Sequence, residues 1–266
     1  MAKGSSSVQY KLDSFATLIG SLTENDFSNV MEPVLEKLQK KNPDSILAAV
    51  KSVVAQIAID LSPYAEKIFV PPLLRQLRSP KEDVRHLAVE LVGSIARHCS
   101  APEVLEHIVM ELLGVLGGKA GVLAQWYQRQ CVIMGLIHVR MGVLSLEQGV
   151  ASIALGAVNA LVPAVDKESH EETRSLGLQC MIQWITMLDS IPSEVLDLLK
   201  KGTKHSSKPV AAAYLTAVSE LSGCISLCTQ LIPLVPCLLQ RIDGAAGKSS
   251  NFHPDGILAA KTLLDI

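Results

Sequence analysis

The chain has 266 residues, of which 48% are hydrophobic and only 4% aromatic, and its formal net charge is −2. Its core must therefore consist of Leu, Val, Ile and Ala, residues that are suited to packing between helices. The small net charge argues against nonspecific nucleic-acid binding driven by bulk charge, but it leaves a local basic patch open. Residues 1–7 are small and polar and lack the apolar segment of a secretory signal.

The first predicted helix covers residues 8–20, where apolar side chains recur at helical spacing. It resembles the second helix of a hairpin whose first helix is missing, so residues 1–22 are interpreted as a partial leading repeat. The last residues, from Leu263 to Ile266, are apolar and provide no polar terminal cap. Because solenoids need polar outer faces on their end repeats, the sequence is expected to be a fragment of a longer protein.

Two consecutive segments, 31–62 and 70–100, carry the same pattern. The next helix is expected to begin with Thr23 as its cap and to run to about Lys41, followed by a partner over 44–60. Equivalent positions are 39 residues apart before the inter-helix turn and 38 apart after it. The matched pairs are Pro33 and Pro72, Leu38 and Leu77, Ile46 and Val84, Val53 and Leu91, Ile57 and Ile95, Ala58 and Ala96, and Ser62 and Ser100. A period of about 40 residues built from two amphipathic helices predicts HEAT-type repeats, whose apolar faces are buried by stacking.

The rest of the chain continues this alternation and shows no strand pattern. In the third hairpin the second helix is expected to begin at Val122, and the fourth hairpin is expected to begin its first helix at Ser145. The uncharged stretch 149–165 contains Asn159 and Pro163 and is interpreted as a buried helix of the repeat array, not as a membrane span. We predict an all-α fold, an α-solenoid of about six HEAT/armadillo-like hairpins continuous over 23–266, with hairpins at about 23–62, 63–100, 101–140, 143–188, 191–222 and 224–266.

Residues that could perform chemistry are scattered. The six cysteines show no paired short spacing, and the seven histidines form no zinc motif. Cys224 and Cys228 lie one helical turn apart, but the sequence supplies no further metal ligands nearby. The cysteines are expected to be reduced thiols of a cytosolic or nuclear protein. We predict no metal site, no cofactor, no small-molecule substrate and no enzyme activity.

Charge separates the two kinds of loop. The formal charges of the residues in the turns within hairpins sum to +4, whereas those in the connections between hairpins sum to −9. Lysines at helix C-termini and acids at N-termini also complement the helix dipoles, so part of this pattern has a structural explanation. The basic edge is nevertheless a candidate site for a polyanion such as the ribosome. The candidate contacts are Lys40, Lys41, Arg78, Lys81, Lys119, Lys200, Lys201, Lys204 and Lys208.

Some side chains are expected to have structural roles. Val84, Arg85 and Ala88 form a pattern found at the start of the second helix of many HEAT repeats, where the arginine bonds to neighbouring turns. Trp126, with Tyr127, and Trp184 are placed inside second helices and are expected to fill the core.

Three short motifs resemble a known family. Residues 59–65 read IDLSPYA, 96–100 read ARHCS and 116–119 read LGGK. In their order and spacing they are similar to the N-terminal HEAT region of the ribosome-associated translational activator of the general-control kinase, which phosphorylates the alpha subunit of initiation factor 2. The resemblance extends from about Phe27 to Asp243.

This resemblance implies a non-catalytic cytoplasmic scaffold that associates with ribosomes, through protein or rRNA, and promotes kinase signalling in amino-acid starvation. Kinase binding is expected only from regions that are absent here, and no membrane contact is expected. The alternative is a HEAT-repeat adaptor that binds proteins, such as a transport receptor, a cytoskeletal array or a phosphatase scaffold. Among these adaptors, a microtubule-binding array is less favoured, because such arrays generally need exposed aromatic residues in their turns and the predicted turns lack tryptophan.

Overall fold

The structure is a computed structural model that describes residues 24–37, 43–119, 121–245 and 254–266. These residues form helices joined by turns, and they contain no strand. The all-α fold of HEAT/armadillo-like hairpins is therefore confirmed. Contacts between Cα atoms divide the chain into an N-terminal unit, residues 1–153, and a C-terminal unit, residues 154–266. The continuity of the array over 23–266 stays a prediction.

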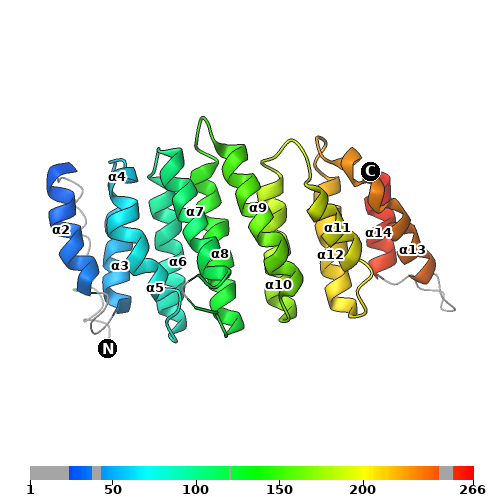
Figure 1. The fold of residues 1–266 in the computed structure, drawn as a ribbon, viewed down its shortest axis with the longest axis horizontal. Coiled ribbons are helices and arrows are strands. Elements are labelled where there is room, and N and C mark those ends of the chain that lie inside the picture. The colour runs from blue at the N-terminus through cyan, green and yellow to red at the C-terminus, as the bar shows by residue number, and fades with distance from the viewer. Residues whose placement is uncertain (1–23, 38–42, 120, 246–253) are drawn as a thin grey trace, which may run out of the picture. The chain divides into compact units, whose positions relative to one another are not determined.

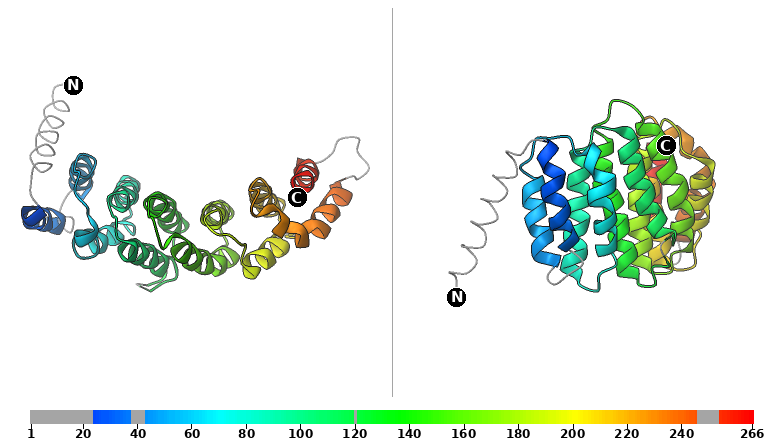
Figure 2. Two further views of the ribbon diagram at one scale, coloured as in Figure 1. Left: turned by 90° about the horizontal axis from the view of Figure 1, so that it is seen from above. Right: turned by 60° about the vertical axis from the view of Figure 1, so that its left-hand side comes forward.

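The N-terminal unit alternates first and second helices of successive hairpins (Figure 1). Its second helices contact one another, α3 with α6 and α6 with α8, and so form one row, which the view from above shows (Figure 2). The helices are α2 (Glu24–Glu36), α3 (Pro43–Val54), α4 (Ser62–Tyr64), the π-helical η2 (Ala65–Phe69), α5 (Val70–Gln76), α6 (Glu82–Arg97), α7 (Pro102–Leu116) and α8 (Trp126–Val143).

The C-terminal unit follows the same plan. Its second helices again contact one another, α10 with α12 and α12 with α14. Helix α9 (Val150–Lys167) crosses the boundary between the units, and the other helices are α10 (Glu171–Ile185), α11 (Ser193–Gly202), α12 (Lys208–Ser222), the 3₁₀ segment η3 (Cys228–Leu234), α13 (Val235–Ala245) and α14 (Pro254–Asp265).

Several helix boundaries differ from the predicted ones. Helix α3 ends at Val54 instead of about residue 60, and α8 begins at Trp126 instead of Val122. Helix α9 begins at Val150 instead of Ser145. Gly121 and Gly149 adopt positive φ angles of 97° and 80°, which interrupt the chain just before α8 and α9. The predicted helix over 8–20 and the Thr23 cap lie outside the described residues.

Helix α9 contains the apolar stretch that was tested as a membrane span. Within the described residues it is the one helix long and apolar enough to cross a membrane, a test that core helices of soluble proteins also pass. Its buried side chains recur every three or four residues, whereas Ser152 and Asn159 are exposed. The buried set is Ile153, Ala154, Ala157, Val158, Leu161 and Val165. This one-sided burial is typical of a helix packed against protein.

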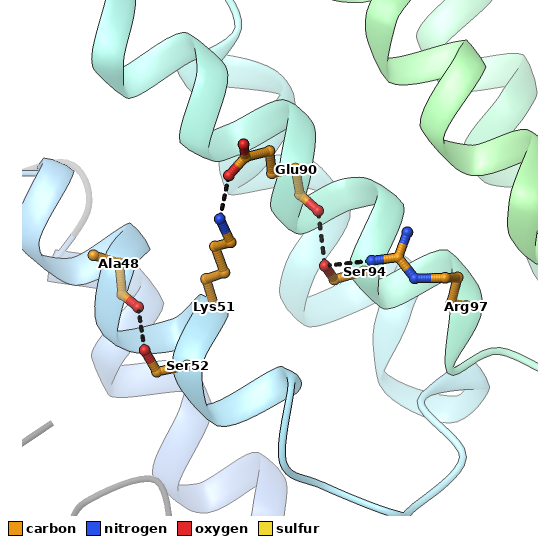
Figure 3. Close-up of polar contacts among 6 residues, drawn as sticks. All are labelled: Ala48, Lys51, Ser52, Glu90, Ser94 and Arg97. Carbon is orange, nitrogen blue, oxygen red and sulfur yellow. Dashed lines mark hydrogen bonds and ion pairs between the residues drawn. The ribbon is translucent and has the colours of Figure 1, made fainter. Parts of the chain in front are cut away.

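The contact between α6 and α8 is very close at two glycines. A Cβ atom added to Gly142 would lie 2.3 Å from the carbonyl oxygen of Ala96, and one added to Gly93 would lie 2.5 Å from the Cβ of His138. Glycine at both positions therefore lets the two second helices approach one another. An ion pair between Lys51 of α3 and Glu90 of α6 joins the preceding pair of second helices (Figure 3).

Ser62 and Ser100, equivalent positions of adjacent repeats, are joined by hydrogen bonds through Asp60. The Asp60 Oδ1 atom accepts from the Ser62 hydroxyl at 2.7 Å and from the Ser100 backbone N–H at 3.2 Å. Its Oδ2 atom accepts from the Ser100 hydroxyl at 2.7 Å. Burial by itself raises the pKa of Asp60, but the hydrogen bonds from the two serines outweigh burial and leave this pKa below its usual value of 3.8.

Replacing Gly142 with alanine is expected to destabilise the N-terminal unit, because the new methyl group overlaps the Ala96 carbonyl. The free energy of unfolding should fall by about 1–3 kcal/mol, measured by urea denaturation followed by circular dichroism. Gly156→Ala in α9 is the matched control, since no heavy atom lies within 4 Å of its added Cβ. This control should raise stability by about 0.5–1 kcal/mol, because alanine favours helix more than glycine. Equal shifts for both variants would contradict the close contact.

Asp60→Asn should lower the free energy of unfolding at neutral pH by about 1 kcal/mol, a modest value because Asp60 is exposed and water screens its charge. The pKa of Asp60 is lower in the folded state than in the unfolded state. The Asp60 carboxylate therefore stabilises the fold fully at pH values above the unfolded-state pKa. This contribution is lost as pH falls through the folded pKa. The difference between wild type and variant should therefore shrink below the usual aspartate pKa of 3.8. Urea titrations across this range measure it, and the exposed Asp197→Asn should show no such trend.

Candidate polyanion-binding turns

The turns of the second and third hairpins lie side by side in the N-terminal unit. The Arg78 Nη2 atom donates to the Gly121 carbonyl at 3.0 Å, and the Gln128 side chain donates to the Arg78 carbonyl at 3.0 Å. Lys119 forms an ion pair with Glu111 at 2.6 Å, so part of its charge is neutralised. Lys81 is exposed. The candidate contacts Lys40 and Lys41 lie outside the described residues.

The turn between α11 and α12 holds the other four candidate lysines, Lys200, Lys201, Lys204 and Lys208, all exposed. The Lys201 Nζ atom lies 2.7 Å from Asp166, in the acidic turn of the preceding hairpin. The Ser207 hydroxyl likewise donates to Glu171, at 2.7 Å. Because the acidic turn neutralises Lys201, the available positive charge is smaller than the sequence count suggests. Within the described part of the chain, the structure shows no ion pair for the other three ammonium groups.

Arginine side chains fix the shape of these turns. Arg85, Arg129 and Arg174 are each the fourth residue of a second helix, α6, α8 and α10. Each donates to the carbonyl oxygen six residues earlier, at 2.9, 2.8 and 2.8 Å respectively. Charge-assisted bonds of this kind satisfy turn carbonyls that no backbone donor reaches. The predicted role of Arg85, bonding to a neighbouring turn, is confirmed.

In the basic turn between α11 and α12, the equivalent hydrogen bonds to turn carbonyls come from an arginine of the next hairpin. The fourth residue of α12 is Ala211, which has no group to donate. Arg241 of α13 donates instead, with Nε to the Thr203 carbonyl at 2.7 Å and Nη2 to the His205 carbonyl at 3.4 Å. His205 stands six residues before Ala211, so the guanidinium of the following hairpin replaces the missing one. The turn that carries the exposed lysines is therefore held in a defined shape.

The two tryptophans have different environments. Trp184 is fully buried, as predicted, but Trp126 is 41% exposed, so the prediction that it fills the core was wrong. The reason is the helix boundary: α8 begins at Trp126 itself, four residues later than predicted, and a first-turn position faces solvent more easily.

The cysteines and histidines add little to this surface. The described residues contain no group of three His, Cys, Asp or Glu side chains that could hold a metal ion. Burial, together with the nearby negative charge of Asp60, raises the pKa of the Cys99 thiol to about 12, which makes it unreactive. Burial and the nearby Arg97 lower the pKa of His98 and of His138. These two histidines are therefore neutral at physiological pH and contribute no positive charge.

Comparison with known proteins identifies relatives. Residues 2–123 match the family described as "Stalled ribosome sensor GCN1 N-terminal". Human "Stalled ribosome sensor GCN1" is 29% identical over 265 residues, which is 97% of this chain but 10% of the human protein. "Protein ILITYHIA" of Arabidopsis thaliana is 32% identical over 115 residues, or 43% of this chain and 4% of that protein.

A solved structure, a designed armadillo repeat protein in complex with a peptide, aligns with 89% of this chain at 14% identity and a TM-score of 0.48. The chain spans about a tenth of the length of the human and mouse relatives that it matches. The family that the three sequence motifs predicted is confirmed: residues 2–123 match the N-terminal family of the stalled ribosome sensor GCN1, and the similarity to GCN1 covers nearly the whole chain.

Proposed function

We propose that this chain is a non-catalytic, cytoplasmic scaffold segment that associates with ribosomes through its basic intra-hairpin turns. The observation that carries the proposal is the α11–α12 turn, where Lys200, Lys204 and Lys208 are exposed on a backbone fixed by Arg241. The similarity to a protein named as a stalled ribosome sensor supports the ribosome as the polyanion that these turns bind. Lysines on a fixed backbone can neutralise phosphates with little further ordering of the turn.

The proposed contribution to kinase signalling is indirect. The chain would hold part of a longer scaffold on the ribosome, and the scaffold would promote phosphorylation of initiation factor 2 alpha in amino-acid starvation. This part of the proposal rests on the family resemblance. In this proposal contact with the kinase belongs to other regions of the longer scaffold, so a pull-down of the kinase with this chain is expected to be negative.

Charge reversal tests the basic turn directly. Lys204→Glu combined with Lys208→Glu should weaken co-sedimentation with purified cytosolic ribosomes and flatten its dependence on salt. Each lost phosphate contact reduces the slope of log affinity against log salt by roughly 0.7–0.9. Lys201 is left unchanged because its partner Asp166 would then lose its ion pair.

The matched control is Lys67→Glu combined with Lys261→Glu, two exposed lysines outside the turns, with the same change in net charge. The control variant should sediment like wild type. Equal losses in both variants would indicate bulk charge, and salt-insensitive binding would indicate a protein contact of the adaptor type. Either result overturns the basic turn as the contact, while the absence of any co-sedimentation overturns ribosome association by this chain.

A further inference from the structure

Trp126 is an exposed aromatic side chain at the basic edge of the N-terminal unit. It is the first residue of α8, and Val122 in the preceding turn is 85% exposed. A tryptophan that is 41% exposed leaves part of its apolar ring surface in water. Exposed tryptophan of this kind is common where a protein binds a partner.

The Trp126 ring contacts Tyr127, which in turn contacts Arg85. The ring of Tyr127 meets Trp126 edge-on, with centroids 5.7 Å apart and an interplanar angle of 79°. The guanidinium of Arg85 lies 4.3 Å from the centre of the Tyr127 ring. Arg85 is itself buried and bonded to the carbonyls of Ser79 and Pro80. The aromatic surface is therefore preorganised, which reduces the entropy lost on binding.

Two cations belong to the neighbouring turn. The Arg78 side chain donates to the carbonyl of Gly121, which precedes Val122. The backbone carbonyl of Arg78 accepts from the Gln128 side chain, two residues after Trp126. Lys81 is exposed three residues further along the same turn. Of the nearby carboxylates, Glu111 pairs with Lys119, whereas Glu82 is exposed and its 3.5 Å contact with the His86 ring is an ion pair only when that ring is protonated. Asp83 is an exposed acid in the first turn of α6, where the helix dipole favours it.

We propose that Trp126 is a stacking site for an unpaired RNA base, with Arg78 and Lys81 contacting the adjacent phosphates. The proposal deepens the proposed function and rests on it, because it names rRNA as the part of the ribosome that this edge binds. Proteins recognise single-stranded RNA by stacking bases on aromatic rings and by neutralising phosphates with basic side chains. An apolar side chain of a protein partner would contact the indole but would not use the positive charges of Arg78 and Lys81 for binding.

Intrinsic fluorescence reports directly on this site, because the chain has two tryptophans and Trp184 is fully buried. Short single-stranded oligoadenylate should quench the fluorescence of the full 266-residue chain. An abasic oligonucleotide with the same backbone should bind more weakly and leave the fluorescence unchanged. Trp126→Ala should weaken oligoadenylate binding roughly 5- to 150-fold, the usual effect of losing one stacked base. Trp126→Phe should recover most of the affinity, since a ring remains.

Leu144→Ala, which removes an exposed apolar side chain just after α8, is the matched control and should bind like wild type. The stacking proposal fails if oligoadenylate and the abasic chain bind alike, or if Trp126→Ala changes neither oligonucleotide nor ribosome binding. It also fails if this variant loses ribosome binding while wild type shows no affinity for oligoadenylate, because the contact is then with protein. A third outcome separates the two proposals. If ribosome binding survives Trp126→Ala but is lost when Lys204 and Lys208 are changed to glutamate, the stacking proposal fails and the proposed function stands.

Discussion

Arginine side chains that bond to turn carbonyls connect the fold of this chain to its candidate surface. A hairpin turn exposes carbonyl oxygens that its two helices cannot satisfy, and an arginine on the fourth residue of the second helix reaches them. Where Ala211 occupies the fourth position, Arg241 from the next hairpin makes the equivalent bonds. Stacking of hairpins and turn geometry are therefore coupled.

The electrostatics of the turns depend on neighbours as well as on composition. An ion pair joins the acidic turn at the end of α9 to the basic turn at the end of α11. Its two residues, Asp166 and Lys201, are 35 positions apart in the sequence. Such exposed pairs add little stability, but they change the charge that a partner meets. The remaining lysines of the basic turn form a smaller and better defined cationic surface than a uniform basic edge.

The similarity to GCN1 supports the interpretation of this chain as a segment of a repeat scaffold. Solenoid hairpins bury their apolar faces on one another and leave the turns to vary. In this chain the turns of the N-terminal unit combine cations with an exposed indole, whereas the turn after α11 has lysines alone. The two surfaces therefore differ in the chemistry that they present.

The sequence by itself determined the all-α class and the hairpin alternation, because helical periodicity and a repeat of about 40 residues are local properties. The family was indicated by the resemblance of three short motifs. The sequence also indicated that Arg85 bonds to a turn, since its position in the repeat fixes its reach. Only the tertiary structure decided that Trp126 is exposed, because α8 begins at this residue and the exposure of its first turn depends on what packs against it. Likewise, only the packing of adjacent turns showed that Asp166 neutralises Lys201 and that Arg241 supports the basic turn. Contacts between residues 35 or more positions apart depend on how the hairpins stack, and no local pattern encodes that geometry.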